Sequence, residues 1–286
     1  MILMEKYVVL YNKLSGTSEE AIKKLEPLIS GKGSVEFKDI TTLGGYAGFF
    51  GDLDAESKLV ICGGDGTLNR FVNEADEFIA DRKIYYFPSG TGNDFVRDVE
   101  LDFTQGPVEI SKYLKNLPTV TVKGKTCKFI NNVGFGIDGY CCQVGDQMKA
   151  SGKVPNYTSI AINGLLFHFK SKNADITIDG KHYEFKNVWI APTMMGRFYG
   201  GGMNAAPEQN RLSEEKTVSL TIMHGKSRIG TLIIFPSIFK GEHVKHTKKV
   251  SVFTGHDITV KCDAPSPLQI DGETVLDVTE YTVSYK

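Results

Sequence analysis

The residues best suited to chemistry lie in a glycine-rich segment, Gly63-Gly64-Asp65-Gly66-Thr67-Leu68-Asn69. The segment follows an apolar run at residues 58–62 that predicts a buried strand, and it precedes apolar residues at helical spacing. Consecutive glycines between a strand and a helix allow several backbone N–H groups to point at one anion, and the helix adds the positive end of its dipole. Asp65 places a carboxylate where a phosphate-bound Mg²⁺ needs one. The segment therefore predicts a phosphate site, with an ordinary strand-to-helix turn as the alternative.

A second glycine-rich turn, Ser89-Gly90-Thr91-Gly92-Asn93-Asp94, follows the next predicted strand at residues 84–87. Parallel strands end at one edge of their sheet, so both turns should open to the side where ligands bind in α/β sheets. Polar turns at residues 12–16 and 41–45 are further candidates for the same edge. None of these turns matches the P-loop or the dinucleotide fingerprint, so the sequence supports neither a P-loop enzyme nor an ordinary dehydrogenase.

Two carboxylates near the C-terminus, Asp271 and Glu273, flank Gly272. In an extended segment, side chains two residues apart point to the same face, so both carboxylates would face one ligand. One could then help to hold Mg²⁺ while the other deprotonates a hydroxyl group during phosphoryl transfer. The alternative is a hairpin turn at the surface, and the tripeptide taken alone favours that alternative.

The elements that must position these residues form two different patterns. The first 120 or so residues alternate strand and helix patterns, including a strand at residues 7–10 and an amphipathic helix at residues 18–29, which predicts a parallel sheet. From about residue 119 the strands are short and β-branched, which is typical of an antiparallel sandwich or barrel. One helical candidate, residues 156–170, interrupts them. We expect an α/β domain over residues 1–120 and a mostly β domain over residues 121–286.

The β-rich half of this prediction rests on seven apolar runs joined by Gly, Asn, Asp and Lys turns. The runs are residues 119–122, 176–178, 188–191, 218–223, 250–253, 258–260 and 281–284. The change of character near Leu117-Pro118-Thr119 places the domain boundary there.

Composition bounds the class of protein. At 286 residues the chain is long enough for about two domains, and 41% hydrophobic and 23% charged residues are ordinary for a globular protein. A net charge of −1 provides no overall positive field for a nucleic acid, so no nucleic-acid partner is expected. Five cysteines without a C-x-x-C pair favour a reducing compartment. With no apolar stretch of the roughly 18 residues that span a bilayer, we expect a soluble, cytoplasmic protein that can still touch a membrane surface.

These segments resemble the diacylglycerol kinase catalytic-domain family, bacterial lipid kinases related to the sphingosine and ceramide kinases. The resemblance rests on the two glycine turns and on residues 12–16, where the family has Asn-Pro-x-Ser-Gly. It continues through residues 129–138, 199–207 and 268–273, so it covers nearly the whole chain.

The resemblance implies an NAD-kinase-like α/β nucleotide-binding domain, a β-sandwich domain, a cleft between them, and a last strand that can return to the first domain. It implies ATP and Mg²⁺ as cofactors, a membrane lipid as substrate and a homodimer. Glu273 matches the proposed proton acceptor, with Asp271 and Asp65 as the other catalytic carboxylates. The implied ATP contacts are Asn12, Lys13, Leu14, Ser15, Gly16, Thr41, Gly63, Gly64, Asp65, Gly66, Thr67, Leu68, Asn69 and Thr91.

Some positions depart from the family pattern. Lys13 stands where proline is usual, Tyr46 where aspartate is usual, and Arg70 where glutamate is usual. Many members hold a structural Mg²⁺ in an Asp-Gly turn, which Glu215-Lys216 replaces here. Because a lysine repels a divalent cation, we expect this metal site to be weakened or lost. The positions to inspect for metal binding, besides Asp65, are Ser213, Glu215 and Thr217.

We therefore expect an ATP- and Mg²⁺-dependent kinase that phosphorylates the primary hydroxyl of diacylglycerol to give phosphatidic acid, in peripheral contact with the membrane. The alternatives are a kinase for another lipid alcohol such as a sphingoid base or an acylglycerol, a kinase for a soluble acceptor like the NAD kinases, and a lipid- or nucleotide-binding protein whose activity has decayed. Two segments stay open: residues 156–170 could line an acyl-chain pocket or cover the core, and residues 240–249 could touch anionic headgroups or form a solvated turn.

Overall fold

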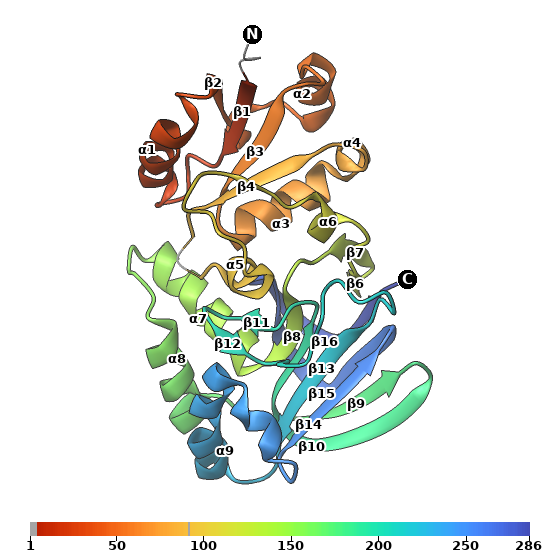
Figure 1. Cartoon of the computed structure of the whole chain (residues 1–286). Coiled ribbons are helices and arrows are strands. Elements are labelled where there is room, and N and C mark those ends of the chain that lie inside the picture. Colours follow the sequence, from red (N-terminus) through yellow and green to blue (C-terminus); the bar gives the residue numbers. More distant parts are fainter. Residues whose placement is uncertain (1–4, 91) are drawn as a thin grey trace. The chain divides into compact units, whose positions relative to one another are not determined.

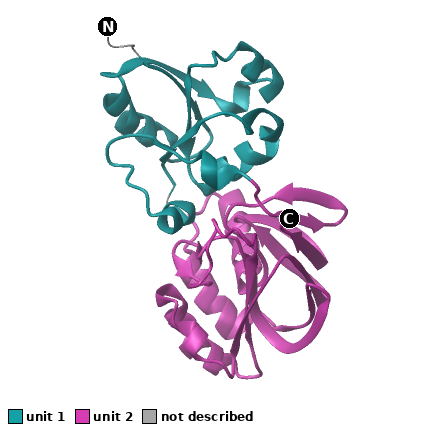
Figure 2. Cartoon of the chain, turned by 45° about the vertical axis from the view of Figure 1, so that its right-hand side comes forward, with its two compact units in different colours: residues 1–115 teal, residues 116–286 magenta. Residues whose placement is uncertain are grey.

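The computed structural model describes residues 5–90 and 92–286. These residues form two compact units, unit 1 and unit 2, which divide between residues 115 and 116 (Figure 2). The predicted boundary after residue 120 falls inside β6 (Thr119–Val122), the first strand of unit 2. Since β6 pairs with β7 (Lys125–Lys128) and β16 (Glu273–Ser284), both in unit 2, the division lies at residue 115 instead.

Unit 1 alternates strands and helices. Its strands are β1 (Glu5–Tyr11), β2 (Gly33–Asp39), β3 (Lys58–Gly63), β4 (Ile84–Pro88) and β5 (Val108–Glu109). Its helices are α1 (Ser18–Ile29), α2 (Tyr46–Asp52), α3 (Asp65–Glu74), α4 (Asp76–Ile79), α5 (Asp94–Val99) and α6 (Ser111–Leu114), with the 3₁₀ turn η1 (Ile40–Thr42).

The sheet of unit 1 has the order β2-β1-β3-β4-β5. Its first four strands are labelled in Figure 1. β1 to β4 are parallel, as predicted, and only the two-residue β5 is antiparallel. The helix α1 covers it with Ala21, Leu25 and Ile29, which recur at helical spacing and are buried together with Val9 and Val60. The parallel strands bring the turns after β1, β2, β3 and β4 to the same edge of the sheet.

Unit 2 is built from strands with helices between them. Its remaining strands are β8 (Asn132–Gly136), β9 (Lys172–Ile178), β10 (Lys181–Met194), β11 (Phe198–Tyr199), β12 (Met203–Asn204), β13 (Val218–His224), β14 (Val250–Gly255) and β15 (Asp257–Ile270). Its helical segments are α7 (Ile137–Ala150), α8 (Tyr157–Asn163), the π-helical η2 (Gly164–His168), α9 (Arg228–Ile234), η3 (Phe235–Lys240) and η4 (Glu242–Lys245).

The strands of the large sheet are antiparallel and follow the order β14-β13-β10-β8-β15-β16-β6-β7. β9 stands beside this path and pairs with both β10 and β15. The long strands β10 and β15 each pair with β9 over one half and with β8 over the other. The predicted fold class, α/β followed by mostly antiparallel β, is confirmed.

Several sequence-based expectations need correction. α7 and α9 were not predicted, and the single predicted helix at residues 156–170 is divided into α8 and η2. The last strand, β16, lies between β15 and β6 in the sheet of unit 2 rather than in that of unit 1. Among the helices that the structure describes, none is long and apolar enough to cross a bilayer.

Candidate functional site

Two glycine-rich turns of unit 1 pack against each other at the carboxyl ends of β3 and β4. A Cβ atom on Gly90 would lie 2.8 Å from the Gly64 Cα atom, and one on Gly64 would lie 3.0 Å from the Gly90 Cα atom. The Ser89 N–H donates to the Gly63 carbonyl oxygen over 3.0 Å, and the buried Tyr86 hydroxyl donates to the same oxygen over 2.7 Å. A side chain at this contact would force the two turns apart, which explains the glycines.

Asp65 opens α3 and also holds the second turn in place. Its carboxylate accepts hydrogen bonds from the backbone N–H groups of Asp94, over 2.9 Å, and Phe95, over 3.2 Å. Both N–H groups belong to the first turn of α5, where a helix has no internal acceptors for them. Asp65 was predicted to act with phosphate-bound Mg²⁺, and its cap on the neighbouring helix was not predicted. A change at Asp65 therefore disturbs both turns.

Asp39, the last residue of β2, ties two of the predicted nucleotide-binding segments together. Its carboxylate accepts the Lys13 N–H over 3.2 Å, the Thr41 N–H over 3.0 Å and the Thr41 hydroxyl over 2.8 Å. Partial burial acts to raise the pKa of Asp39, but the hydrogen bonds from Thr41 and Lys13 and the charge of Lys13 lower it overall. Asp39 was not predicted from the sequence, although an aspartate two residues before its backbone donor is a recognisable turn signal.

The other residues expected to contact a nucleotide occupy the loop after β1, the turn η1 and the start of α3. The Asn12 side-chain oxygen accepts the Leu14 N–H, and its carbonyl accepts the Ser15 N–H, both over 3.0 Å. Leu68 is fully buried, so its side chain belongs to the core, and its expected contact with a nucleotide stays a prediction for the backbone alone. Thr91 lies outside the described residues. The exposed members of the set are Lys13, Leu14, Gly16, Thr41 and Gly66, the half-buried ones Asn12, Ser15, Gly64, Asp65 and Asn69, and the buried ones Gly63, Thr67 and Leu68.

Two departures from the family pattern have structural roles in unit 1. Tyr46 is buried, and its ring centroid lies 5.7 Å from that of Phe71 in an edge-on contact. Burial, with a smaller effect of Glu74, raises the pKa of the Tyr46 hydroxyl to about 12. The Arg70 Nε atom donates to the Glu74 carboxylate over 2.7 Å, one turn along α3. Packing and a helix-surface ion pair therefore account for these two side chains.

In unit 2, Asp271-Gly272-Glu273 includes the hairpin turn between β15 and β16. Asp271 and Gly272 have φ angles of 46° and 92°, and Ile270 pairs with Glu273 across the turn. Positive φ at both central residues is the type I′ geometry that Asp-Gly favours. The expectation that Asp271 and Glu273 lie on one face of an extended strand is therefore wrong, and the hairpin alternative is correct.

The Asp271 carboxylate is occupied by the backbone that leads into β8. It accepts N–H groups from Ile130 over 2.6 Å, Asn131 over 2.8 Å and Asn132 over 2.9 Å. Hydrogen bonds to an ionised carboxylate are stronger than neutral ones, so three of them hold the turn firmly. Asp271 is thus a positioning residue, and the exposed Glu273 at the start of β16 is better placed to meet a ligand.

Asp138, in the first turn of α7, is a buried carboxylate that the sequence analysis did not single out by itself. It is 7% exposed, and among the described residues neither oxygen has a hydrogen-bond partner of good geometry. Burial raises the pKa of Asp138 to about 7, against opposing effects of the Gly139 N–H and the nearby Gln269 amide. Gln269 also accepts the Gly272 N–H over 2.9 Å, which links the surroundings of Asp138 to the hairpin turn. An aspartate at the start of an unpredicted helix gave no usable signal.

The three residues named for a structural cation, Ser213, Glu215 and Thr217, line one cavity of about 290 Å³ in unit 2. Glu208 and Gln209 line the same cavity. The fold therefore brings the three residues together.

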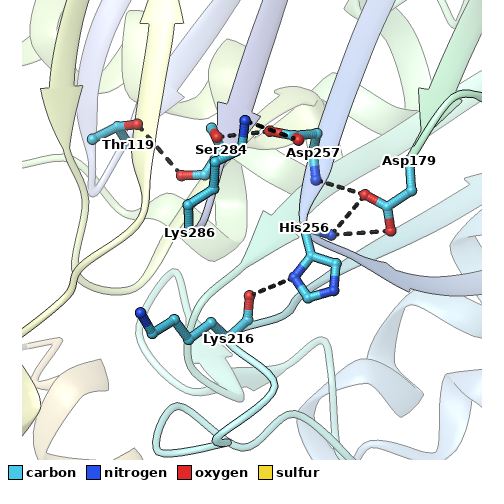
Figure 3. A network of polar contacts seen from close by, with 7 residues as sticks. All are labelled: Thr119, Asp179, Lys216, His256, Asp257, Ser284 and Lys286. Carbon is cyan, nitrogen blue, oxygen red and sulfur yellow. Dashed lines mark hydrogen bonds and ion pairs between the residues drawn. The ribbon is translucent and has the colours of Figure 1, made fainter.

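The backbone around this cavity has protein partners where a cation would need oxygen ligands. The Gln209 Nε2 atom donates to the Thr217 carbonyl over 2.8 Å. The His256 Nδ1 atom donates to the Lys216 carbonyl oxygen over 3.2 Å, as Figure 3 shows. His256 is fixed in turn because the Asp179 carboxylate accepts its backbone N–H over 3.0 Å. Both carbonyl oxygens thus face donors from this chain.

These residues do not fit a Mg²⁺ ion, which demands near-octahedral oxygen coordination. Within residues 5–90 and 92–286, the one group of three side chains placed to share a metal is the exposed trio Asp175, His182 and Glu184 on the β9–β10 hairpin, outside this cavity. Loss of the structural cation stays a prediction, and no step of the reaction is assigned to it.

Comparisons with known proteins match both units. Residues 6–123 match the family model described as "Diacylglycerol kinase catalytic domain", and residues 131–283 match "YegS C-terminal NAD kinase beta sandwich-like domain". The second match alone covers more than half of the chain.

Individual relatives agree with the family models. YtlR of Bacillus subtilis (strain 168), named a candidate lipid kinase, is 26% identical over 234 residues, covering 76% of this chain and 74% of YtlR. A diacylglycerol kinase of Staphylococcus carnosus (strain TM300) is 25% identical over 289 residues, covering 93% of this chain and 87% of that protein. The structure of a candidate diacylglycerol kinase from Bacillus anthracis (strain Sterne) has a TM-score of 0.70 at 16% identity, covering 98% of this chain and 92% of that one, which supports the fold.

Proposed function

The chain belongs to the diacylglycerol kinase family of lipid kinases, and from that premise we propose that it transfers the γ-phosphate of ATP to the primary hydroxyl of diacylglycerol, giving phosphatidic acid. The observation that carries this proposal is the contact between two glycine turns at the carboxyl edge of the parallel sheet. Such an edge, with a helix N-terminus behind it, suits a phosphate chain.

Unit 1 binds ATP in this proposal. The backbone N–H groups at the start of the ten-residue helix α3 face the phosphates, and the helix dipole favours their negative charge. The loop at Asn12 and the threonine Thr41 contribute from the neighbouring strand ends, and Asp39 keeps these two segments together. Phosphoryl transfer depends mainly on positioning and charge neutralisation, so this fixed frame is the chief contribution of unit 1.

A Mg²⁺ ion bound with ATP would neutralise charge on the phosphates. Asp65 is the residue that would hold it, because a carboxylate oxygen is a ligand that Mg²⁺ prefers and this side chain is already fixed by two backbone N–H groups.

Unit 2 supplies the proton acceptor. Glu273 takes the proton of the lipid hydroxyl while the hydroxyl oxygen forms a bond to the γ-phosphorus and the bond to the β–γ bridging oxygen breaks, leaving ADP. Asp271 does not touch the reacting atoms; it holds the turn through Ile130, Asn131 and Asn132 so that Glu273 keeps its position.

The test is transfer of labelled phosphate from ATP to acceptors in detergent micelles. Diacylglycerol, monoacylglycerol and sphingosine are compared with NAD in solution, using the wild type, Glu273→Gln and the control Glu280→Gln, an exposed glutamate on the same strand. We expect labelled phosphatidic acid from the wild type and the control, and a large loss with Glu273→Gln. Label in another lipid or in NADP, with none in phosphatidic acid, would reject diacylglycerol as the acceptor. Activity of Glu273→Gln equal to that of the wild type would reject Glu273 as the proton acceptor.

A further inference from the structure

Three large apolar side chains are displayed on two helical segments of unit 2: Phe167 on η2, and Ile229 and Ile233 on α9. We call them the apolar ridge. They are 69%, 69% and 74% exposed, respectively. Single exposed apolar residues are ordinary on protein surfaces, but several on adjacent elements indicate an interaction surface.

Arg228 fixes the two helical segments beside each other. Its guanidinium donates to the Leu165 carbonyl over 2.8 Å and to the Phe169 carbonyl over 2.9 Å, so α9 begins against the end of η2 (Figure 1). The guanidinium also lies 5.4 Å from the centre of the Trp189 ring. Because Ile229 and Ile233 are four residues apart, they lie on one face of α9. The ridge is thus a feature of the packed structure.

The inner faces of the same segments are already used. The residues that α8, η2, α9 and η3 contribute to one buried cluster around Trp189 are Ile160, Ala161, Leu165, Ile234 and Phe235. The ridge residues cannot turn inward without expelling these side chains. The ridge is therefore not a displaced part of the core, and its side chains face outward from the unit.

The charge around the ridge is strongly one-sided. Residues 147–174 and 224–249 contain ten of the chain's 33 lysines and arginines but only one of its 34 acidic residues, Glu242. Glu242 pairs with Lys245 over 3.1 Å. In a chain of net charge −1, this concentration of cations around an apolar surface is local and favours an anionic partner.

Three of these lysines adjoin the ridge. Lys170 follows η2, Lys226 precedes α9, and both are exposed. The Lys249 ammonium group lies directly against Gly230, which is next to Ile229 on α9. Lys249 is therefore placed beside the ridge, whereas the Arg228 guanidinium is occupied by carbonyl oxygens.

We propose that the apolar ridge, with Lys170, Lys226 and Lys249, docks the protein on the surface of an anionic lipid bilayer. The inference rests on the proposed function, because a kinase for an insoluble lipid must reach its acceptor at a bilayer. Apolar side chains enter the boundary between headgroups and acyl chains, and the cations contact phosphate groups. Lys149 pairs with Asp146 over 3.5 Å and Lys245 with Glu242 over 3.1 Å, but the three lysines that adjoin the ridge lie among apolar residues, which favours a lipid surface over a protein partner.

The first test is sedimentation with vesicles in the absence of ATP. Vesicles of phosphatidylcholine alone are compared with vesicles that also contain phosphatidylglycerol. We expect the wild type to bind the anionic vesicles preferentially, and the double variant Ile229→Ser/Ile233→Ser to bind them at least tenfold more weakly. The matched control is Leu212→Ser/Leu276→Ser, two leucines that are 43% and 48% exposed elsewhere on unit 2. The variant Lys226→Gln/Lys249→Gln should lose the preference for phosphatidylglycerol.

The second test locates the ridge directly and does not depend on a loss of binding. A Phe167→Trp variant should shift its fluorescence to shorter wavelength when anionic vesicles are added, because the new ring enters an apolar environment. Leu276→Trp should not shift, and the spectrum of the wild type with and without vesicles gives the contribution of the buried Trp189, which is subtracted from both variants.

Three outcomes would overturn the proposal: vesicle binding of the ridge variant equal to that of its control, no spectral shift at position 167, or a dimer of the wild type that the ridge substitutions dissociate, which would assign the surface to a second copy. Activity on a short-chain, water-soluble diacylglycerol separates this proposal from the proposed function. The ridge variant should keep that activity and lose activity on vesicles, whereas a wild type that binds vesicles but phosphorylates neither acceptor would refute the function and leave the docking surface standing.

Discussion

Unit 1 and unit 2 each place an aspartate beside a glycine turn, but they use the glycine differently. In unit 1, Gly64 and Gly90 leave out a Cβ atom because backbone lies against backbone. In unit 2, Gly272 has open space where a Cβ atom would stand and is required for its φ of 92°. Both aspartates, Asp65 and Asp271, hold backbone N–H groups. Each unit therefore uses an aspartate to hold its backbone in place. In unit 1 the same residue, Asp65, is also the one proposed to hold Mg²⁺, whereas in unit 2 the proposed proton acceptor is a different residue, Glu273.

The largest effect on activity should come from Glu273, the carboxylate of unit 2 that does not hold the backbone. Glu273→Gln should lower kcat for lipid phosphorylation by about 10²- to 10⁴-fold, the usual contribution of a general base. Because Glu273 is exposed, the melting temperature should not change. Steady-state kinetics and thermal denaturation check both expectations. A variant that melts early would show a structural role instead.

Asp271→Asn should break the positioning in unit 2. The substitution weakens three hydrogen bonds to an ionised acceptor, so we expect a loss of about 3 kcal/mol in the free energy of unfolding. Urea denaturation measures it. Unchanged stability together with a loss of kcat as large as that of Glu273→Gln would instead make Asp271 a catalytic carboxylate.

Asp138 is the contrasting case. Unlike Asp65 and Asp271, this buried carboxylate has no hydrogen-bond donor of good geometry among the described residues. Its pKa in the folded protein, about 7, lies above the ordinary 3.8, so the folded state binds the extra proton between these values and stability falls as the pH rises through them. Above pH 7 the penalty is complete. Asp138→Asn should therefore stabilise the protein by up to about 4 kcal/mol at pH 8, at about 1.36 kcal/mol for each pKa unit, and not at pH 4. Urea denaturation at both values decides, and an equal gain at both would contradict the assignment.

The smallest effect is expected at the glycine contact of unit 1. Gly90→Ala should cost about 1 to 2 kcal/mol and raise the KM for ATP, because the new Cβ atom pushes the turns apart. Gly92→Ala is the matched control, since its Cβ atom would meet nothing closer than 3.7 Å. If both variants behave alike, the contact between the turns is not what shapes the site.

The fold was predictable where local pattern and packing agree. The helix at residues 18–29 has the predicted limits because its apolar residues recur at helical spacing, and the strand at residues 119–122 is alternating and β-branched. α7 was missed because Gly139 and Gly145 lower its helix propensity. Both glycines are explained by tertiary contacts, with the Pro267 backbone and with the Tyr157 ring, that no local pattern reveals.

The candidate site was predictable in its turns and less so in its side-chain roles. The glycine turns of unit 1 were located correctly because strand, glycine and helix signals coincide. The role of Asp271 was misjudged although Asp-Gly between apolar runs is a strong hairpin signal. Asp39 and Asp138 were missed because their importance comes from residues that are distant in the sequence, such as Lys13 and Gln269.

The sheet of unit 2 also bears on aggregation. Since β8 and β9 each have β10 on one side and β15 on the other, the path of paired strands ends at β14 and β7. β7 carries Lys125 and Lys128, charges that discourage the addition of a foreign strand. β14 reads Val-Ser-Val-Phe-Thr-Gly, with no charge and with Val252 42% exposed. This edge is where unfolding intermediates should pair with one another, and a lysine introduced there would protect the protein in concentrated solution.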